Sequence, residues 1–286
     1  MLTVGVPVYN AQHLLERCLK NLCAEDLDYR IVISDNASTD KTEEIARAFV
    51  HSDSRVRYIR HESNMGAGNN FLFLLNSADT ELFAWRAYDD LSSPGYFRSL
   101  TQALRENPQS NLAVGGLHYE VTQGQPLPIQ PVPDVLPVEL ARRRKVLLKI
   151  AEVTWFYGVF RRGALRKRFV DAQAAYSYVW SLDPLVILPF LLEGSVVTDS
   201  SVTFTQYVCG GSAASYRPKG VIACSRLVSQ FCRHGFAIAN EMATSPGERL
   251  RLYADVLRYS NSHGLKFSRI AKRAMLWPYY RLRDRL

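Results

Sequence analysis

Two adjacent carboxylates, Asp89 and Asp90, follow a short apolar run at residues 82–85. In an open α/β sheet, a strand that ends here delivers its last residues to the crevice where such sheets bind ligands. Neighbouring side chains on an extended strand face opposite ways, so the two acids should have different roles unless the chain has already turned. We predict that Asp90 binds a divalent cation and that Asp89 binds a ligand hydroxyl. The alternative is a pair of solvated turn acids before a helix, because residues 92–94 supply capping serines and a first-turn proline.

Two further predicted strands, residues 2–8 and 30–34, end next to polar side chains. Tyr9 follows the first strand and could stack on a nucleobase. Asp35 follows the second strand and could accept a hydrogen bond from a base N–H. Packing for Tyr9 and turn formation for Asp35 are the alternatives.

The loop at residues 63–70 carries glycines and amide side chains. Gly66 permits close approach of the backbone to a ligand, and the neighbouring Asn64 and Asn70 can hydrogen-bond to it. A plain turn is the alternative. The sequence has no G-x-G-x-x-G fingerprint and no P-loop, which argues against a dinucleotide site or a Walker-type phosphate site.

Short apolar strands alternate with helix-like segments through the first half of the chain. This spacing predicts an α/β fold in which a parallel, doubly wound sheet is covered by helices on both faces. Asn10 is predicted to cap the first helix, and Asp40 with Glu43 to form a capping-box variant that opens the second. In chain order, strands are predicted at residues 2–8, 30–34, 56–60, 82–85 and 112–116, and helices at 11–22, 40–49, 71–75 and 94–105.

The second half begins with five prolines between residues 123 and 137. Proline can continue neither a helix nor a central strand, so this segment should separate two halves of the chain. The pattern after it predicts a helix at 138–153, a buried strand at 155–160, a helix at 180–192, a strand at 196–207 and helices from residue 220 onward.

The composition is that of an ordinary globular protein, with 286 residues, 47% hydrophobic and 22% charged. It excludes a disordered or fibrous chain and allows one large domain or two small ones.

We expect no signal peptide, because the first seven residues lack a basic stretch and a cleavage pattern. No apolar run approaches the ~18 residues that span a bilayer. Five cysteines without a C-x-x-C pair favour a reduced, cytoplasmic setting.

The net charge of +8 belongs entirely to residues 249–286, which hold ten Lys or Arg and two Asp or Glu. Within this tail, apolar side chains recur at helical spacing from Phe267 to Ala274, with basic residues between them and aromatic residues after them. A basic amphipathic helix of this kind can lie on an anionic membrane surface. A docked terminal helix with a solvated basic face is the alternative. No recognition motif supports a nucleic-acid partner.

Together these motifs resemble the inverting glycosyltransferases of family 2, and the resemblance covers roughly residues 2–216. It implies the GT-A fold, a Rossmann-like, mostly parallel sheet flanked by helices. The implied division is a nucleotide-sugar-binding half at residues 1–122, an acceptor-binding half at 123–216 and a helical, basic C-terminal region at 217–286. The segments that carry the resemblance are residues 6–10, 34–40, 64–66, 70–71, 85–90, 157–162 and 182–183.

The resemblance also implies roles for individual residues. Asp89 would contact the ribose of the donor, and Asp90 would bind Mg²⁺ or Mn²⁺ bridging its diphosphate. Asp183 would be the catalytic general base, for which a partly desolvated pocket should raise its pKa; an N-cap position before Pro184 is the alternative. The residues placed around the nucleotide are Pro7, Tyr9, Asn10, Asp35, Asn64, Gly66 and Asn70.

The implied activity is a metal-dependent, hexosyltransferase-type reaction. A UDP- or dTDP-sugar would donate its sugar to a hydroxyl of a glycan or lipid-linked glycan during synthesis of a cell-surface polysaccharide. The expected location is the cytoplasm or the inner face of the plasma membrane.

The sequence also departs from its relatives. Val208 and Cys209 stand where many relatives have Arg and His, and Ala87 replaces the first acid of a longer acidic motif. A thiol suits Mg²⁺ poorly. The second hypothesis is therefore a catalytically degenerate GT-A protein that binds nucleotide or glycan without transfer. A nucleotidyltransferase would need a glycine-rich, basic loop after the first strand, and residues 9–13 do not resemble one.

Overall fold

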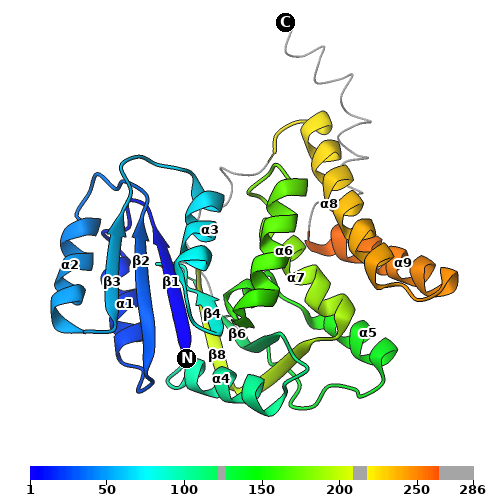
Figure 1. Ribbon diagram of the computed structural model, residues 1–286, viewed down its shortest axis with the longest axis horizontal. Helices are drawn as coiled ribbons and strands as arrows, with labels where there is room; N and C mark the ends of the chain where they lie inside the picture. Colours follow the sequence, from blue (N-terminus) through cyan, green and yellow to red (C-terminus); the bar gives the residue numbers. More distant parts are fainter. Residues whose placement is uncertain (122–126, 209–217, 264–286) are drawn as a thin grey trace, which may run out of the picture.

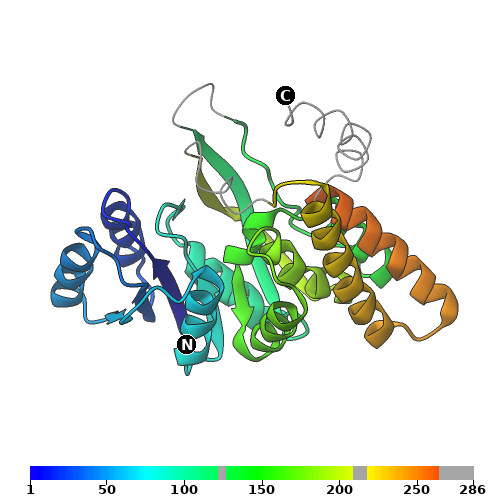
Figure 2. The same ribbon diagram turned by 90° about the horizontal axis from the view of Figure 1, so that it is seen from above.

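The computed structural model describes residues 1–121, 127–208 and 218–263. Within these ranges one eight-stranded sheet has the order β3-β2-β1-β4-β7-β6-β8-β5 (Figure 1). The strands are β1 (Leu2–Val8), β2 (Tyr29–Asp35), β3 (Val56–Arg60), β4 (Leu82–Trp85), β5 (Leu91–Ser92), β6 (Leu112–Val121), β7 (Val159–Arg161) and β8 (Val196–Val208). Figure 2 shows β6 and β8 extending side by side beyond the other strands.

The sheet is mixed. β3, β2, β1 and β4 pair in parallel, and β6 pairs in parallel with β8. β7 is antiparallel to both β4 and β6, and β5 is antiparallel to β8. The prediction of a mostly parallel sheet flanked by helices is therefore confirmed, with the two short strands β5 and β7 as its antiparallel members. The predicted strand at 155–160 is also wrong in its first half, where η1 (Val153–Tyr157) is a 3-10 helix.

Helices cover both faces of the sheet, because its strands alternate between two separate apolar clusters. In β4, Leu82 and Ala84 pack in one cluster, and Phe83 and Trp85 pack in the other. The first face is covered by α1 (Leu15–Cys23), α2 (Thr42–Ser52) and α4 (Tyr96–Glu106), and the second by α3 (Ala67–Ser77), α6 (Arg162–Ala175) and α7 (Leu182–Glu193).

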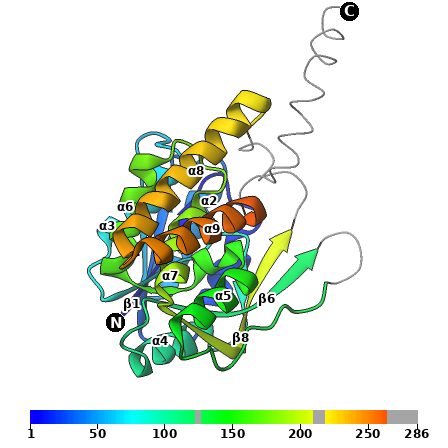
Figure 3. The same cartoon turned by 90° about the vertical axis from the view of Figure 1, so that its right-hand side faces the viewer.

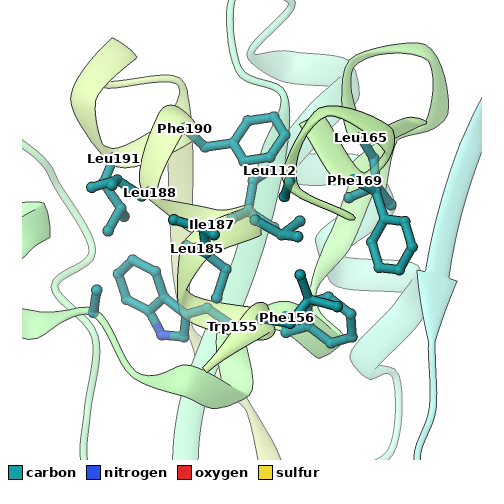
Figure 4. Close-up of a cluster of buried hydrophobic side chains, with 14 of the residues drawn as sticks. Leu112, Trp155, Phe156, Leu165, Phe169, Leu185, Ile187, Leu188, Phe190 and Leu191 are labelled. Atoms are coloured by element: carbon teal, nitrogen blue, oxygen red, sulfur yellow. The ribbon is translucent and has the colours of Figure 1, made fainter. Parts of the chain in front are cut away.

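The second cluster is built around α7, whose apolar side chains are buried on all sides. A helix that is apolar all round belongs in a core. Figure 4 shows Leu185, Ile187 and Phe190 of α7 among side chains from β6, η1 and α6. The cluster continues into α5 (Leu140–Ile150), α8 (Val221–Met242) and α9 (Pro246–His263), and Figure 3 shows α8 and α9 crossing one another on this side. In the described residues, no helix is both long and apolar enough to cross a membrane.

Two predicted helix starts are wrong because the polar side chains bind elsewhere. Asn10 has a positive φ of 50°, and its side-chain carbonyl accepts the Thr39 N–H at 2.9 Å, so α1 begins only at Leu15. Asp40 accepts the Thr42 N–H at 3.0 Å from outside α2. Glu43 pairs with arginine side chains instead of returning to the backbone of Asp40, so the capping box is not formed.

The helix start predicted at residues 92–94 is also displaced. Ser92 lies in β5, and its hydroxyl accepts a hydrogen bond from Arg86 at 2.8 Å. The Ser93 hydroxyl accepts the Thr203 N–H of β8 at 2.9 Å. The helix α4 begins at Tyr96 after Gly95, whose φ is +78°. Both serines therefore fasten the segment after the acid pair to the sheet instead of capping a helix.

Gly158 lets β7 lie close to β6, and its replacement is expected to destabilise the fold. A Cβ at this position would lie 2.5 Å from the Ala113 carbonyl oxygen and 2.8 Å from a Leu112 methyl group. We expect Gly158→Ala to lower the free energy of unfolding by about 2 kcal/mol, because backbone must move to relieve the overlap. Urea unfolding followed by circular dichroism measures this difference.

Gly163→Ala is the matched control, because no atom lies within 4 Å of a Cβ at Gly163, in the first turn of α6. It should leave the stability unchanged or raise it by up to about 1 kcal/mol. Equal unfolding midpoints for the two variants would contradict the close packing of β7 on β6.

Candidate active site

The acid pair lies in a turn directly after β4, and not on the strand itself. The turn is closed by a hydrogen bond from the Asp90 N–H to the Ala87 carbonyl at 3.2 Å. Asp90 is buried, and its Oδ1 accepts the Tyr207 N–H of β8 at 2.9 Å. Burial, followed by the charge of Asp89, raises the pKa of Asp90 to about 7, and burial also raises the pKa of Asp89.

These two carboxylates suit a hard divalent cation. Among the described residues, neither acid has an ion pair with a basic side chain, so a cation at this place would relieve the repulsion between them. The same residues hold no cluster of three or more His, Cys, Asp or Glu side chains that could bind a metal alone. Mg²⁺ characteristically keeps waters and ligand oxygens in addition to one or two carboxylates.

Arg86 is a buried cation at the start of the acid turn. One terminal nitrogen of its guanidinium donates to Ser92 Oγ at 2.8 Å and the other to Asn21 Oδ1 at 3.2 Å. The charged carbon lies 5.2 Å from the ring centroids of both Phe97 and Phe204. Cation–π contacts of this kind strengthen when they are desolvated. Arg86 therefore places a fixed positive charge behind the acid pair, and its charge opposes the rise in the pKa of Asp90.

Asp183 lies in the first turn of α7, on the other side of the same region. The N-cap position is taken by Ser181, so the alternative of Asp183 as a helix cap is wrong. Burial raises the pKa of Asp183 to about 7. Its side chain lines a cavity of about 380 Å³, which is within the range of small-molecule sites. The pKa of Asp183 suits a general base near neutral pH.

The cavity is aromatic with a few polar groups, and six elements and the segment before α7 form its walls. Phe71 comes from α3, Phe156 and Tyr157 from η1, Trp180 from the segment before α7, Gln206 from β8 and His263 from the end of α9. Gln206 directly precedes Tyr207, whose N–H binds Asp90. The cavity beside Asp183 therefore adjoins the turn that carries the acid pair.

Tyr157 lies near both Asp183 and the acid pair Asp89 and Asp90. Burial raises the pKa of Tyr157 well above its ordinary value, and the charges of Asp90, Asp183 and Asp89 raise it further. A side chain whose pKa responds to all three carboxylates lies near each of them, because Coulomb interactions in a protein fall with distance. The sequence separates Asp90 from Asp183 by more than ninety residues, and the fold brings both beside Tyr157.

Three of the residues predicted to bind the nucleotide, Pro7, Tyr9 and Asp35, lie at the C-terminal ends of β1 and β2. Tyr9 is exposed, with 46% of its surface accessible, and Pro7 pairs in register with Ser34. Asp35 is fully buried. Its carboxylate accepts hydrogen bonds from the Ser38 N–H and hydroxyl, the Tyr58 hydroxyl and Arg60. A carboxylate has about four acceptor positions, so a base N–H reaches Asp35 only by replacing one of these bonds.

The loop before α3 is partly open and partly internal. Asn64 is exposed, and its side-chain carbonyl accepts hydrogen bonds from the Asn36 side chain at 2.7 Å and from the Gly66 N–H at 2.8 Å. Gly66 has a φ of +85°, which favours glycine. Asn70 is buried and bonds twice to Ser34, through its side-chain oxygen at 2.5 Å and its nitrogen at 3.0 Å. Asn64 and Gly66 are therefore accessible to a ligand, whereas Asn70 joins α3 to β2.

Sequence reasoning did not assign a role to three side chains near the acids. Arg17 of α1 donates to the Asp89 carbonyl, pairs with Glu120 at 2.7 Å and lies over the Tyr207 ring. Arg86 and Tyr157 belong to the segments 85–90 and 157–162, which carry the family resemblance without a role for either residue. An arginine beside two acids in an apolar run was the available signal for Arg86, while nothing local marks Arg17. Residues 209–212, which include Cys209, and the predicted tail helix at 266–280 lie outside the described residues.

Comparison with known proteins gives one family. The model described as "Glycosyl transferase family 2" matches residues 3–169. Glycosyltransferase GlyG of Streptococcus pneumoniae is 26% identical over 126 residues, which are 43% of this chain and 42% of that protein. The GalNAc(5)-diNAcBac-PP-undecaprenol beta-1,3-glucosyltransferase of Campylobacter jejuni is 30% identical over 37% of this chain and 35% of its own length. Each match thus spans less than half of the curated relative.

Solved structures share the fold. The TarS 1–349 complex of S. aureus with UDP-GlcNAc aligns with a TM-score of 0.70 and 16% identity, over 91% of this chain and 72% of that one. The mannosyltransferase PcManGT of Pyrobaculum calidifontis, in complex with GDP-Man and Mn²⁺, aligns with a TM-score of 0.54 and 17% identity, over 98% and 79% of the two chains. The mixed, mostly parallel sheet with its helical C-terminal region is a GT-A fold.

Proposed function

The chain belongs to glycosyl transferase family 2, and we propose that it transfers a sugar from a nucleoside-diphosphate donor to a hydroxyl of a glycan or lipid-linked glycan. The observation that carries this proposal is that the cavity lined by Asp183 adjoins the turn of Asp89 and Asp90, because Gln206 in its wall directly precedes Tyr207, which bonds Asp90. An acid pair for a metal diphosphate and a base for an acceptor hydroxyl must face one another across the transferred sugar. The cavity beside Asp183, which adjoins the acid turn, supports such an arrangement.

The donor lies along the C-terminal ends of β1, β2 and β4 in this proposal. The nucleobase lies near Pro7, Tyr9 and Asp35, with Asn10 beside them, and the loop bearing Asn64 and Gly66 approaches the same side. Asn70 supports that loop through its bonds to Ser34. The exposed ring of Tyr9 is available for stacking on the base. A uracil or thymine donor fits the motifs that carry the resemblance.

Asp89 would bind the ribose, and Asp90 would hold a Mg²⁺ or Mn²⁺ ion together with the diphosphate. Such an ion would supply neutralisation of the charge that develops on the leaving diphosphate. The buried guanidinium of Arg86 adds a fixed positive charge behind the pair, in a site where electrostatic stabilisation is strong because water is excluded.

Asp183 removes the proton from the acceptor hydroxyl. The oxygen of that hydroxyl forms a new bond to the anomeric carbon as the bond from this carbon to the diphosphate oxygen breaks. The electron pair of the broken bond leaves with the nucleoside diphosphate, and the proton stays on Asp183. One in-line displacement inverts the anomeric carbon. The raised pKa of Asp183, about 7, makes its carboxylate a stronger base than an exposed aspartate.

The second candidate function is nucleotide or glycan binding without transfer. It is motivated by Val208 and Cys209 at positions where many relatives have Arg and His.

The first proposal also includes the division of the chain at residues 122 and 216, a place in cell-surface polysaccharide synthesis, and a location in the cytoplasm or at the membrane surface. The basic residues of the tail motivate the membrane contact.

Nucleotide release is the direct test. The full chain is incubated with UDP-glucose, UDP-galactose, UDP-N-acetylglucosamine, dTDP-rhamnose and GDP-mannose, each with Mn²⁺ or with a chelator. We expect metal-dependent release of nucleotide from at least one donor. Calorimetry with UDP and dTDP separates the two functions: binding that requires Mn²⁺ supports transfer, whereas metal-independent binding without any release supports the degenerate protein.

A further inference from the structure

The ring of Tyr157 is held rigidly by other aromatic rings. It stacks on Phe204 of β8 with centroids 5.3 Å apart and planes 3° from parallel, and it meets Phe156 edge to face at 5.5 Å. Phe156 in turn stacks on Trp85 at 4.5 Å, and Figure 4 shows it packed in the apolar cluster. A side chain fixed by packing holds its polar end in one place, as a binding site requires.

The hydroxyl of Tyr157 has no hydrogen-bond partner among the described residues, although its ring lines the cavity with Asp183. Among the other tyrosines, the buried Tyr259 hydroxyl also has no partner in the described residues, whereas Tyr29 and Tyr176 are bonded internally. Tyr29 donates to the Leu22 carbonyl at 2.6 Å, and Tyr176 donates to the Trp180 carbonyl at 2.7 Å. Tyr157 is partly accessible and lines the cavity, so its hydroxyl is available to a ligand oxygen there, and tyrosine hydroxyls in such half-buried positions usually find a partner. A ligand in the cavity would supply the missing partner.

The chemistry of that partner follows from the surroundings. Burial and three nearby carboxylates keep the pKa of Tyr157 well above its ordinary value, so the phenol stays protonated at physiological pH. It can therefore donate to a neutral oxygen. The space between the acid pair and the base is where the proposed reaction places the transferred sugar, whose hydroxyls are neutral acceptors with apolar C–H faces between them. The rings of Phe71 and Trp180 in the cavity wall suit such faces.

We propose that the Tyr157 hydroxyl donates a hydrogen bond to a hydroxyl of the transferred sugar, and so positions that sugar between Asp90 and Asp183. This role rests on the proposed function. It makes Tyr157 a determinant of donor-sugar specificity, because a site built to bond a hydroxyl discriminates against a sugar that lacks it. The nucleotide itself does not contact Tyr157.

Tyr157→Phe tests the role, because phenylalanine keeps the ring stacking and removes only the hydroxyl. The probes are the nucleotide sugar that releases most nucleotide in the panel above and the matching nucleoside diphosphate, each titrated by calorimetry with Mn²⁺. We expect a three- to tenfold loss of affinity for the nucleotide sugar, the size of one neutral hydrogen bond. The affinity for the bare diphosphate should change by less than twofold. Tyr253→Phe is the control, since that hydroxyl joins α9 to Asn240 of α8 and neither residue lines the cavity.

Deoxy analogues of the donor sugar identify the partner hydroxyl. Removing that hydroxyl should weaken binding to the wild-type chain and leave binding to Tyr157→Phe unchanged. Equal affinities of wild type and Tyr157→Phe for the nucleotide sugar would overturn the role, and so would an equal loss for sugar and bare diphosphate. If the wild-type chain binds no nucleotide sugar, the proposed function itself fails; if it transfers sugar and Tyr157→Phe behaves like it, only the role of Tyr157 fails.

Discussion

Replacing Asp90 with asparagine is expected to lower sugar transfer by about 10³-fold or more, because a metal ion contributes several kcal/mol of charge stabilisation and each 1.4 kcal/mol is a factor of ten. The variant should fold normally. The asparagine carbonyl can still accept the Tyr207 N–H that now binds Asp90 at 2.9 Å. Removing a buried carboxyl whose pKa is raised to about 7 also removes a desolvation cost. Nucleotide release measures the transfer, and calorimetry should show that Mn²⁺ no longer strengthens binding of the nucleoside diphosphate.

Asp199→Asn is the matched control for this prediction. Asp199 also accepts a backbone N–H, from Ser201 at 2.9 Å, but it lies in β8 away from the cavity that contains Asp183. Its replacement should leave transfer within twofold of wild type. Activity of Asp90→Asn within tenfold of wild type, or a metal requirement that persists unchanged, would exclude Asp90 as the metal ligand.

Replacing Asp183 with asparagine should lower transfer by about 10²- to 10⁴-fold, the usual contribution of general base catalysis. The expected signature differs from that of Asp90→Asn. Binding of the nucleoside diphosphate and its dependence on Mn²⁺ should be retained, because the proposed role places Asp183 at the acceptor hydroxyl and not at the diphosphate. Loss of nucleotide affinity in Asp183→Asn would instead indicate a structural role for this residue.

The raised pKa of Asp183 predicts how both sugar transfer and the stability of the fold change with pH. Burial raises its pKa to about 7 from an ordinary value of 3.8, so transfer by the wild type should rise with pH and level off above about pH 7, as the base loses its proton. The same shift makes the folded state bind the proton more tightly than the unfolded state. Asp183 therefore destabilises the fold increasingly as pH rises from about 4 through 7.

Thermal unfolding checks this sign. The melting temperature of Asp183→Asn minus that of wild type should be larger at pH 8 than at pH 5, because asparagine has no proton to lose. A difference that is independent of pH would mean that the carboxyl is not desolvated in the folded chain.

The positions of several strands were predictable because their signal is local. The predicted residues 2–8, 56–60 and 82–85 coincide with β1, β3 and β4, of which β1 and β4 are mainly apolar and buried. A strand covered on both faces is apolar along its whole length, and the polar residues that follow it mark its end. The GT-A fold and the family followed from the order and spacing of the motifs at those strand ends.

Helix starts were less predictable because a polar side chain can bind a distant partner instead of its own helix. Asn10 binds the loop after β2, and Ser92 binds Arg86. The contacts of the Arg86 guanidinium join Asn21 of α1 to Phe204 of β8, which lie far apart along the chain. Such long-range pairing has no periodicity in the sequence.

The end of α9 has a consequence for where the acceptor comes from. His263 lines the cavity beside Asp183, and its ring bonds the Ala151 carbonyl at 2.9 Å. Lys266, the first basic residue after the end of α9, follows only three residues later, a reach of at most about 11 Å. If the tail binds the surface of an anionic bilayer, it also keeps the cavity wall close to the lipid headgroups. An acceptor carried on a lipid could then enter the cavity by lateral diffusion in the membrane, and the enzyme would search a surface instead of a volume.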